Sequence, residues 1–392
     1  MQLSSLTERL GDDAESAWRV HILARERQQK GEDILILSIG EETEEVTADC
    51  IVESAVKSLR AGRHHYTDVR GTEDLRQAIC HRHQQITGQA VSSDTCTVYC
   101  GAQNSLFAVA QCLLEPGNEI ILPEPYYTSY PGVFCCTGAT AVKVSGSHEN
   151  LYLADIETIE RAVTPKTRAI VITQPGNPMG SYYGKEQLQR LVDFCIAKDI
   201  WLISDEVYTL LLAPEDRCNP ATYDPEQKCV VTINSLSKSN RMTGWRMGWV
   251  VTPPKLAEAL AELSMVMHFG IPPFIMDAAV TALEEDKDTA ENIRLAMNSR
   301  RQVCKEILQP LKNTQLLDAG AGMFLILDVA GTGLSGEEFA LRLLEEHAVA
   351  ILPCTGFGNG CESLTRIGLC VAEEPLAIAC QRIAEFSMSL GN

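Results

Sequence analysis

The chain has 392 residues, and its acidic side chains outnumber its basic ones by 52 to 33, giving a formal net charge of −19 at pH 7. This charge balance argues against nucleic acid or an anionic lipid surface as a partner, because both require an excess of Lys and Arg on some face. Hydrophobic residues make up 45% and charged residues 22%, as in a folded globular protein with a large core. No apolar run reaches the length of a membrane span and the first residues lack the pattern of a signal peptide, so we expect no membrane.

Short apolar or β-branched runs alternate with amphipathic stretches along residues 46–280. This alternation predicts a mostly parallel sheet covered by helices on both faces, in a large α/β domain. Helical patterns between the runs include Ser105–Leu114 and Glu186–Lys198. The seven expected strands are Thr95–Cys100, Glu119–Leu122, Ala141–Val144, Ala169–Thr173, Trp201–Ser204, Val230–Ile233 and Met247–Val251.

The pattern changes near Met276, and we expect residues 281–392 to form a smaller α+β domain on which the N-terminal segment 1–45 packs. A pair of strands is expected around Gly322–Asp328 and Leu364–Cys370. The expected helices are Asp277–Glu285, Thr289–Leu311, Glu337–Glu346 and Glu374–Leu390.

The fifteen cysteines are odd in number, scattered through apolar segments and without a CxxC pair. Small buried thiols in a reducing cytoplasm are therefore favoured over a disulfide framework. Cys80, His81 and His83 are residue types that bind metals, but their spacing does not place them on one helix face. We expect no metal site.

Five of the seven expected strands are followed directly by polar or aromatic residues. In open parallel sheets, ligands bind outside the carboxyl ends of the strands, so these residues should meet at one edge. The five segments are Gly101–Gln103, Pro123–Tyr127, Gln174–Gly180, Asp205–Tyr208 and Asn234–Lys238.

The combination of groups at this edge is the one that pyridoxal phosphate chemistry needs. A lysine binds the cofactor aldehyde as a Schiff base, a carboxylate keeps the pyridine nitrogen protonated, and a helix start with a hydroxyl and an arginine holds the phosphate. The matching residues are Lys238 for the aldehyde; Asp205 for the ring nitrogen; Gly101, Ala102, Gln103, Ser235 and Arg246 for the phosphate; Asn177 and Tyr208 for the ring hydroxyl; and Tyr127 for stacking on the ring.

Each of these residues also has an ordinary structural interpretation. Lys238 alone would be a surface lysine. For Asp205 alone, the role of a helix N-cap is an equally good explanation. Asn177, between a glycine and a proline, is typical turn chemistry, and Tyr127 could be a core residue. The functional interpretation depends on the set as a whole.

The motif Ser235-Leu236-Ser237-Lys238, followed by Thr243-Gly244-Trp245-Arg246-Met247-Gly248, resembles the lysine motif of the class I/II aminotransferases of fold type I. Further resemblances run through the whole chain, and the combination is specific. They are His65–Gly71 with Leu75-Arg76, the N-P-x-G loop in Gln174–Gly180, D-E-x-Y in Asp205–Tyr208, and the carboxylate-binding arginine in Thr365–Gly368.

This resemblance implies a ping-pong transfer of an amino group from an L-amino acid to a 2-oxo acid, with Lys238 as Schiff-base lysine and proton shuttle. It implies catalytic roles for Asp205 and Tyr208 and binding of the substrate carboxylate by Gly40, Asn177 and Arg366. It also implies a homodimer in which Tyr66 reaches the phosphate of the neighbouring subunit.

Within the family, the H-Y-x-D-V-R-G element and the G-A-Q turn resemble the arginine:pyruvate transaminase subgroup. The chain departs from the family at Met179, where Thr or Ser is common, and after Gly40, where Glu41, Glu42, Glu44 and Glu45 replace a G-x-P pattern. These carboxylates would favour a cationic donor such as arginine over aspartate or glutamate. The alternative is that they form a solvated loop.

Two other functions fit parts of the sequence. A pyridoxal-phosphate C–S β-lyase would share the fold and the cofactor residues. It would differ in releasing ammonia and pyruvate without a 2-oxo acid. A ligand-sensing domain of a transcription regulator would need a basic helix-turn-helix region, for which the acidic N-terminal part has no room.

Overall fold

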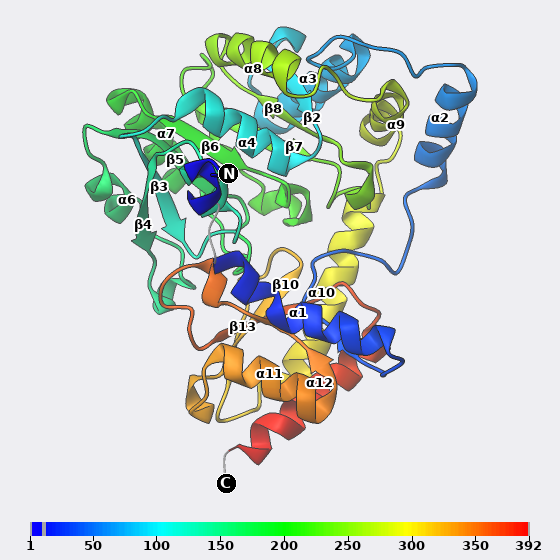
Figure 1. Cartoon of the computed structure of the whole chain (residues 1–392), viewed down its shortest axis with the longest axis vertical. Coiled ribbons are helices and arrows are strands. Elements are labelled where there is room, and N and C mark those ends of the chain that lie inside the picture. Colours follow the sequence, from blue (N-terminus) through cyan, green and yellow to red (C-terminus); the bar gives the residue numbers. More distant parts are fainter. Residues whose placement is uncertain (1, 10–12, 391–392) are drawn as a thin grey trace.

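The computed structural model describes residues 2–9 and 13–390. Residues 1 and 10–12 of the expected N-terminal segment and residues 391–392 of the expected C-terminal domain lie outside the described residues. Within the described part of the chain, no helix combines the length and the apolar character needed to cross a bilayer. Two sheets organise the fold, with the larger one in the upper part of Figure 1 and the smaller one below it.

The larger sheet has seven strands in the order β2-β8-β7-β6-β5-β3-β4. Strand β8 pairs antiparallel with both of its neighbours, whereas the pairs among β3, β4, β5, β6 and β7 are parallel. The expected mostly parallel sheet is therefore confirmed, and each expected strand agrees with an observed one to within two residues at each end. The strands are β2 (Cys96–Tyr99), β3 (Glu119–Glu124), β4 (Thr140–Ser145), β5 (Thr167–Thr173), β6 (Trp201–Asp205), β7 (Val230–Ser235) and β8 (Gly248–Val251).

Both faces of this sheet are buried, which explains why its strands are almost continuously apolar. Successive residues alternate between the two faces, so that Ile120 and Leu122 pack on one face and Ile121 on the other. The first face carries α4 (Ala102–Leu113), α5 (Tyr130–Cys135) and α8 (Pro254–Met267). The opposite face carries α2 (Asp49–Arg60), α3 (Glu73–Thr87), α6 (Ile156–Ala162), α7 (Lys185–Lys198) and α9 (Pro273–Glu284).

The smaller sheet is antiparallel, in the order β12-β13-β10-β9, and it packs against helices from both ends of the chain. Its expected strand pair is observed as β10 and β13. The strands are β9 (Gln315–Leu317), β10 (Phe324–Asp328), β12 (Leu352–Pro353) and β13 (Leu364–Gly368), and the helices are α10 (Thr289–Leu308), α11 (Gly336–His347) and α12 (Glu373–Ser389).

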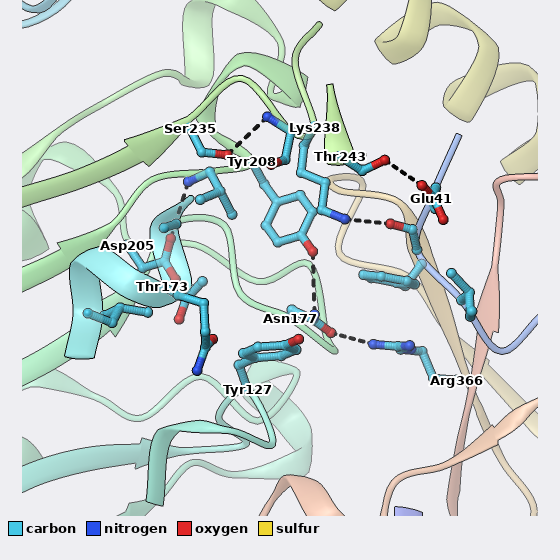
Figure 2. A pocket seen from close by; sticks show the side chains of 18 of the residues that line it. Glu41, Tyr127, Thr173, Asn177, Asp205, Tyr208, Ser235, Lys238, Thr243 and Arg366 are labelled. Atoms are coloured by element: carbon cyan, nitrogen blue, oxygen red, sulfur yellow. Dashed lines mark hydrogen bonds between the residues drawn. The ribbon is translucent and has the colours of Figure 1, made fainter. Parts of the chain in front are cut away.

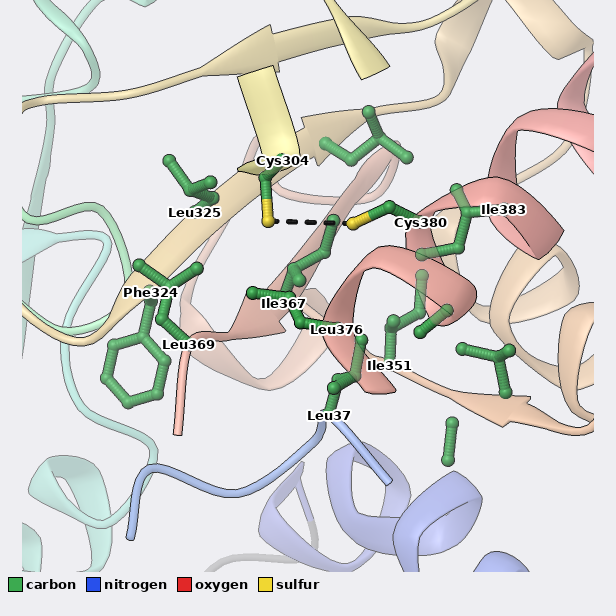
Figure 3. Packing of buried hydrophobic residues seen from close by; sticks show 14 of the residues in the cluster. Leu37, Cys304, Phe324, Leu325, Ile351, Ile367, Leu369, Leu376, Cys380 and Ile383 are labelled. Carbon is green, nitrogen blue, oxygen red and sulfur yellow. Dashed lines mark hydrogen bonds between the residues drawn. The ribbon is translucent and has the colours of Figure 1, made fainter. Parts of the chain in front are cut away.

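The N-terminal helix α1 (Asp13–Gln29) lies across the lower part of Figure 1, beside α11. The short strand β1 (Leu35–Ile36) pairs in parallel with β11 (Val349–Ala350). Leu37 then enters the core of this region with Ile351, Ile367 and Leu376 (Figure 3). Residues 18–37 thus share a core with the C-terminal third of the chain, although the exact domain limits at 45 and 280 stay a prediction.

Candidate active site

A cavity of about 310 Å³ lies at the carboxyl ends of the parallel strands. The segments after five strands of the larger sheet contribute to its walls, because parallel strands end at the same edge. The smaller sheet contributes Phe324 and Arg366, and the N-terminal part contributes Trp18 and Gly40. The residues at the strand ends are Ala102 and Gln103 after β2, Tyr127 after β3, Asn177 after β5, Asp205 and Tyr208 at the end of β6, and Ser235 and Lys238 at the end of β7.

One wall of the cavity has the form of an anion cradle at the start of α4. Gly101 precedes the helix with a φ of +84°, and a Cβ there would collide with the Arg246 guanidinium. A Cβ on Gly248 would come within 2.6 Å of the Ala102 nitrogen. Both glycines therefore allow backbone and guanidinium to close around the first N–H groups of α4, where an anion is stabilised. Arg246 is held in place by donating from Nη1 to the carbonyl oxygen of Thr243, at 2.6 Å.

Asp205 is a buried carboxylate, 5% exposed, at the end of β6. Its Oδ2 accepts a hydrogen bond from the hydroxyl of Tyr130 at 2.8 Å, and its Oδ1 accepts one from the backbone nitrogen of Val207 at 3.3 Å. Burial raises the pKa of Asp205 to about 6, although both hydrogen bonds act to lower it. No cation of the described chain pairs with Asp205. The site therefore suits a ligand with a protonated ring nitrogen.

Lys238 lies at the centre of the view in Figure 2, after the turn that follows β7. In this turn the Ser237 backbone nitrogen donates to Ser235 Oγ, at 3.0 Å. The Lys238 amine donates to the carbonyl oxygen of Gly40, at 2.6 Å. Burial lowers the pKa of Lys238, which raises the share of the neutral, nucleophilic amine.

Arg366 on β13 is 2% exposed and has only neutral partners. Its Nη1 donates to Asn177 Oδ1 at 2.7 Å, its Nη2 donates to the carbonyl oxygen of Ser38 at 2.8 Å, and its Nε has no partner in the described chain. The guanidinium lies 4.0 Å from the centre of the Phe324 ring. A buried guanidinium with a free N–H fits the carboxylate of a ligand.

Tyr208 and Tyr127 complete the wall near Asn177 (Figure 2). Asn177 Nδ2 donates to the Tyr208 hydroxyl oxygen at 3.4 Å, so the two polar groups expected at a ring oxygen do lie together. Tyr66, in contrast, does not line the cavity: it is 86% exposed and packs edge to face with Phe269, at 5.2 Å between ring centres.

Sequence reasoning missed three residues that shape the site. Tyr130 supports Asp205, Trp18 lines the cavity from α1, and the carbonyl of Ser38 positions Arg366. Tyr130 could have been noticed in the aromatic segment after β3. No local pattern marks Trp18 or Ser38, because their roles arise from contacts between distant parts of the chain.

The structure corrects one expectation about the acidic run after Gly40. Only Glu41 lines the cavity. Glu42 is buried in an ion pair with Arg300, with 2.6 Å between Oε2 and Nη1, and Glu45 pairs with Arg241 at 2.7 Å. Glu44 is exposed. The expectation that all four carboxylates lie beside the substrate is therefore wrong for three of them. Glu42 and Glu45 form ion pairs with arginines, and Glu44 faces solvent.

The sequence matches the family model described as aminotransferase class I and II over residues 32–383. The chain belongs to this family. Among curated proteins, this aminotransferase is 42% identical to the arginine–pyruvate transaminase of Pseudomonas aeruginosa over 98% of both chains. It is 30% identical to an aspartate aminotransferase of Pyrococcus horikoshii, over 91% of this chain and 92% of the other.

Solved structures also resemble the aminotransferase along its whole length. The aspartate aminotransferase of Thermus thermophilus with maleate superposes with a TM-score of 0.92 at 28% identity, covering 98% of this chain and 100% of the other. The enzyme from Rhizobium meliloti gives 0.92 at 26% identity, over 99% of both chains. The α/β fold of type I aminotransferases and the enzyme class, transferase of amino groups, are thus confirmed.

Aminotransferases of this family depend on pyridoxal phosphate, and the cavity fits that cofactor on three observations. The glycine-lined cradle at α4 suits a phosphate, and the unpaired carboxylate of Asp205 suits a protonated pyridine. The buried amine of Lys238, whose pKa is lowered by burial, suits the cofactor aldehyde. The free Nε of Arg366 leaves a place for the carboxylate of a substrate beside them.

Proposed function

We propose that this aminotransferase uses pyridoxal phosphate to move an amino group from a basic L-amino acid, arginine foremost, to a 2-oxo acid such as pyruvate, in a ping-pong cycle. The observation that carries the proposal is the convergence of Lys238, Asp205 and Arg366 on one cavity from separate elements. The choice of arginine is supported by the 42% identity to a protein named arginine–pyruvate transaminase.

The cofactor, when bound, supplies an aldehyde that takes up the amino group and a ring that draws electrons from the substrate Cα. In the proposal, Asp205 keeps the proton on the ring nitrogen, because its buried negative charge stabilises a cation there. Asn177 and Tyr208 donate hydrogen bonds to the ring oxygen, and Tyr127 packs on the ring face. The phosphate is held by Gly101, Ala102, Gln103, Ser235 and Arg246.

Lys238 has two tasks in the proposed cycle. It carries the cofactor through its amine between turnovers, and it moves a proton at the substrate Cα during turnover. Its bond to the Gly40 carbonyl fixes the amine beside the place of the substrate. Gly40, Asn177 and Arg366 hold the α-carboxylate and so orient the Cα hydrogen toward Lys238.

We also propose that the active form is a homodimer in a reducing cytoplasm. The high exposure of Tyr66 and of its neighbour Phe269 supports a partner surface there, with Tyr66 reaching the phosphate site of the other subunit. All fifteen cysteines are free thiols, which supports the location.

The test is a set of half-reactions of the purified holoenzyme with each standard amino acid, followed by absorbance. We expect arginine to convert the cofactor to its amino form and pyruvate to restore the aldehyde form. Release of ammonia and pyruvate from a sulfur amino acid, without any 2-oxo acid, would instead identify a C–S β-lyase. If no amino acid converts the cofactor to its amino form, the proposal is overturned.

A further inference from the structure

Five of the described residues that line the active-site cavity have an acidic or a basic side chain: Glu41, Asp205, Lys238, Arg246 and Arg366. The proposed function uses the last four for the ring nitrogen, the aldehyde, the phosphate and the α-carboxylate. Glu41 is the charged group that remains. The part of the cavity left for the substrate's side chain therefore offers a negative charge and no positive one.

The carboxylate of Glu41 is oriented but not neutralised. The hydroxyl of Thr243 donates to its Oε1, and the carbonyl of Thr243 is in turn bound by Arg246. No Lys or Arg of the described residues lies within ion-pair distance of Glu41, although Lys238 is near enough to interact with it electrostatically. The Glu41 side chain is half-buried. A carboxylate that is fixed, partly removed from water and without a direct ion-pair partner favours a cationic ligand.

Trp18 is a second, independent feature of the same cavity. It reaches the cavity from α1, is half-buried, and is held edge to face against His21 with 5.8 Å between ring centres. A planar guanidinium can stack on an indole face while forming two parallel hydrogen bonds to a carboxylate. An ammonium group is attracted to the carboxylate and to the ring as a point charge, but it forms neither the two parallel hydrogen bonds nor the planar stack.

Figure 2 shows how these groups are arranged around Lys238. Glu41 and Arg366 both lie on the side of the Lys238 amine that faces away from Asp205. An amino acid with its carboxylate on Arg366 and its Cα beside Lys238 can thus direct its side chain toward Glu41. We propose that Glu41 and Trp18 form the subsite that selects a guanidinium-bearing donor, an inference that rests on the proposed function.

The chain contains a matched control for this subsite. Glu44 belongs to the same acidic run and carries the same charge, but it is exposed and does not line the cavity. Replacing Glu44 changes the net charge and the long-range field in the same way as replacing Glu41. Any difference between the two variants therefore reports on the local contact.

The experiment measures kcat/KM of the holoenzyme for arginine, lysine and alanine as amino donors. Pyruvate in fixed excess is the amino acceptor for arginine and lysine, and another 2-oxo acid is the acceptor for alanine. We expect Glu41→Gln to lower the arginine-to-alanine ratio by about tenfold, as for loss of one charge-assisted hydrogen bond. Glu44→Gln should leave that ratio as in the wild type. Trp18→Leu should lower the arginine-to-lysine ratio, because the stacking surface is lost.

A second readout does not depend on turnover. The inhibitors 5-guanidinopentanoate and hexanoate both present a carboxylate to Arg366 and both lack the reacting amine, but only the first carries a guanidinium. The wild type should bind 5-guanidinopentanoate about tenfold more tightly than hexanoate, and Glu41→Gln should reduce the difference to the part that stacking on Trp18 supplies.

Equal losses for arginine and alanine in Glu41→Gln, or equal binding of the two inhibitors by the wild type, would overturn the subsite while leaving the aminotransferase function intact. A wild type that prefers aspartate would overturn the subsite together with the basic donor of the proposed function, while the aminotransferase activity would stand. The failure of every amino acid to react would instead overturn the proposed function itself. The two failures are thus distinguishable.

Discussion

Lys238 and Gly40 are 198 positions apart in the chain, yet the Lys238 amine donates a hydrogen bond to the Gly40 carbonyl oxygen at 2.6 Å. The same N-terminal segment binds Arg366 through the carbonyl of Ser38, at 2.8 Å. One short stretch of backbone therefore positions both the amine and the guanidinium of the site. A shift of this segment would move the two groups together, so its anchors matter for the site geometry.

The anchor of this segment in the smaller sheet region is the buried ion pair between Glu42 and Arg300. We predict that Glu42→Ala lowers the free energy of unfolding by about 3–5 kcal/mol, because it leaves Arg300 buried without its counter-ion. The double variant Glu42→Ala/Arg300→Ala should lose less than the sum of the single losses. Urea unfolding measures all three. Glu45→Ala is the control: Glu45 is largely exposed and its pair should contribute about 0–1 kcal/mol.

Replacing Lys238 by alanine should reduce transamination by several orders of magnitude, because the amine that moves the Cα proton is removed. The circular dichroism spectrum and the elution volume should stay those of the wild type. Lys255→Ala, on an exposed position of α8, is the control and should keep its activity. Near-normal turnover by Lys238→Ala would place the catalytic lysine elsewhere.

Asp205→Asn should have opposite effects on the apoenzyme and the holoenzyme. The pKa of Asp205 is raised from an ordinary 3.8 to about 6, so ionising the buried carboxyl destabilises the folded apoenzyme as pH rises through this window. Above pH 6 the Asn variant of the apoenzyme should therefore be more stable than the wild type, by up to ~3 kcal/mol, and near pH 4 the gain should vanish.

In the holoenzyme, the same substitution should be harmful, because it should lower the catalytic activity. The Asn variant loses the charge that keeps the ring nitrogen protonated, so its rate should fall far more than its cofactor affinity. Chemical denaturation of the apoenzyme at pH 4 and 7.5 and single-turnover kinetics test the two halves. An apoenzyme that is destabilised by Asp205→Asn at pH 7.5 would contradict the account of burial given above.

Gly101→Ala and Gly117→Ala form a matched pair, since both glycines have a positive φ, of +84° and +93°. Each substitution should cost about 1 kcal/mol of stability through backbone strain. A Cβ at Gly101 also collides with Arg246, whereas a Cβ at Gly117 meets no atom within 4 Å. Only Gly101→Ala should weaken the binding of pyridoxal phosphate to the apoenzyme, by about tenfold or more. Equal affinities would refute the phosphate cradle.

Tyr66→Phe and Lys238→Ala subunits, mixed and allowed to exchange, test the shared site of the proposed homodimer. If Tyr66 serves the other subunit, a hybrid contains one site that is free of both lesions, and its activity should exceed that of either parent. Subunit exchange is verified by mass on differently tagged chains. Verified hybrids with no gain in activity would show that Tyr66 does not complete the neighbouring site.

Much of the larger sheet and of its polar edge could be predicted because each depends on local patterns. Strands buried on both faces leave continuous apolar runs in the sequence, and parallel strands must end at one edge. For that reason Asn177, Asp205 and Lys238 could be grouped before any coordinates were seen. The helical pattern of Thr289–Leu311 was also correct, except that α10 ends three residues earlier, at Leu308.

The arrangement around the irregular segment after Gly40 depended on the tertiary structure alone. Four glutamates in five residues look equivalent in sequence, because an irregular segment has no period that assigns side chains to faces. Arg300 and Arg241, far along the chain, pair with Glu42 and Glu45. These contacts decide which of the glutamates is left to face solvent or the cavity. The support of Asp205 by Tyr130 was likewise set by packing between elements that only the folded chain brings together.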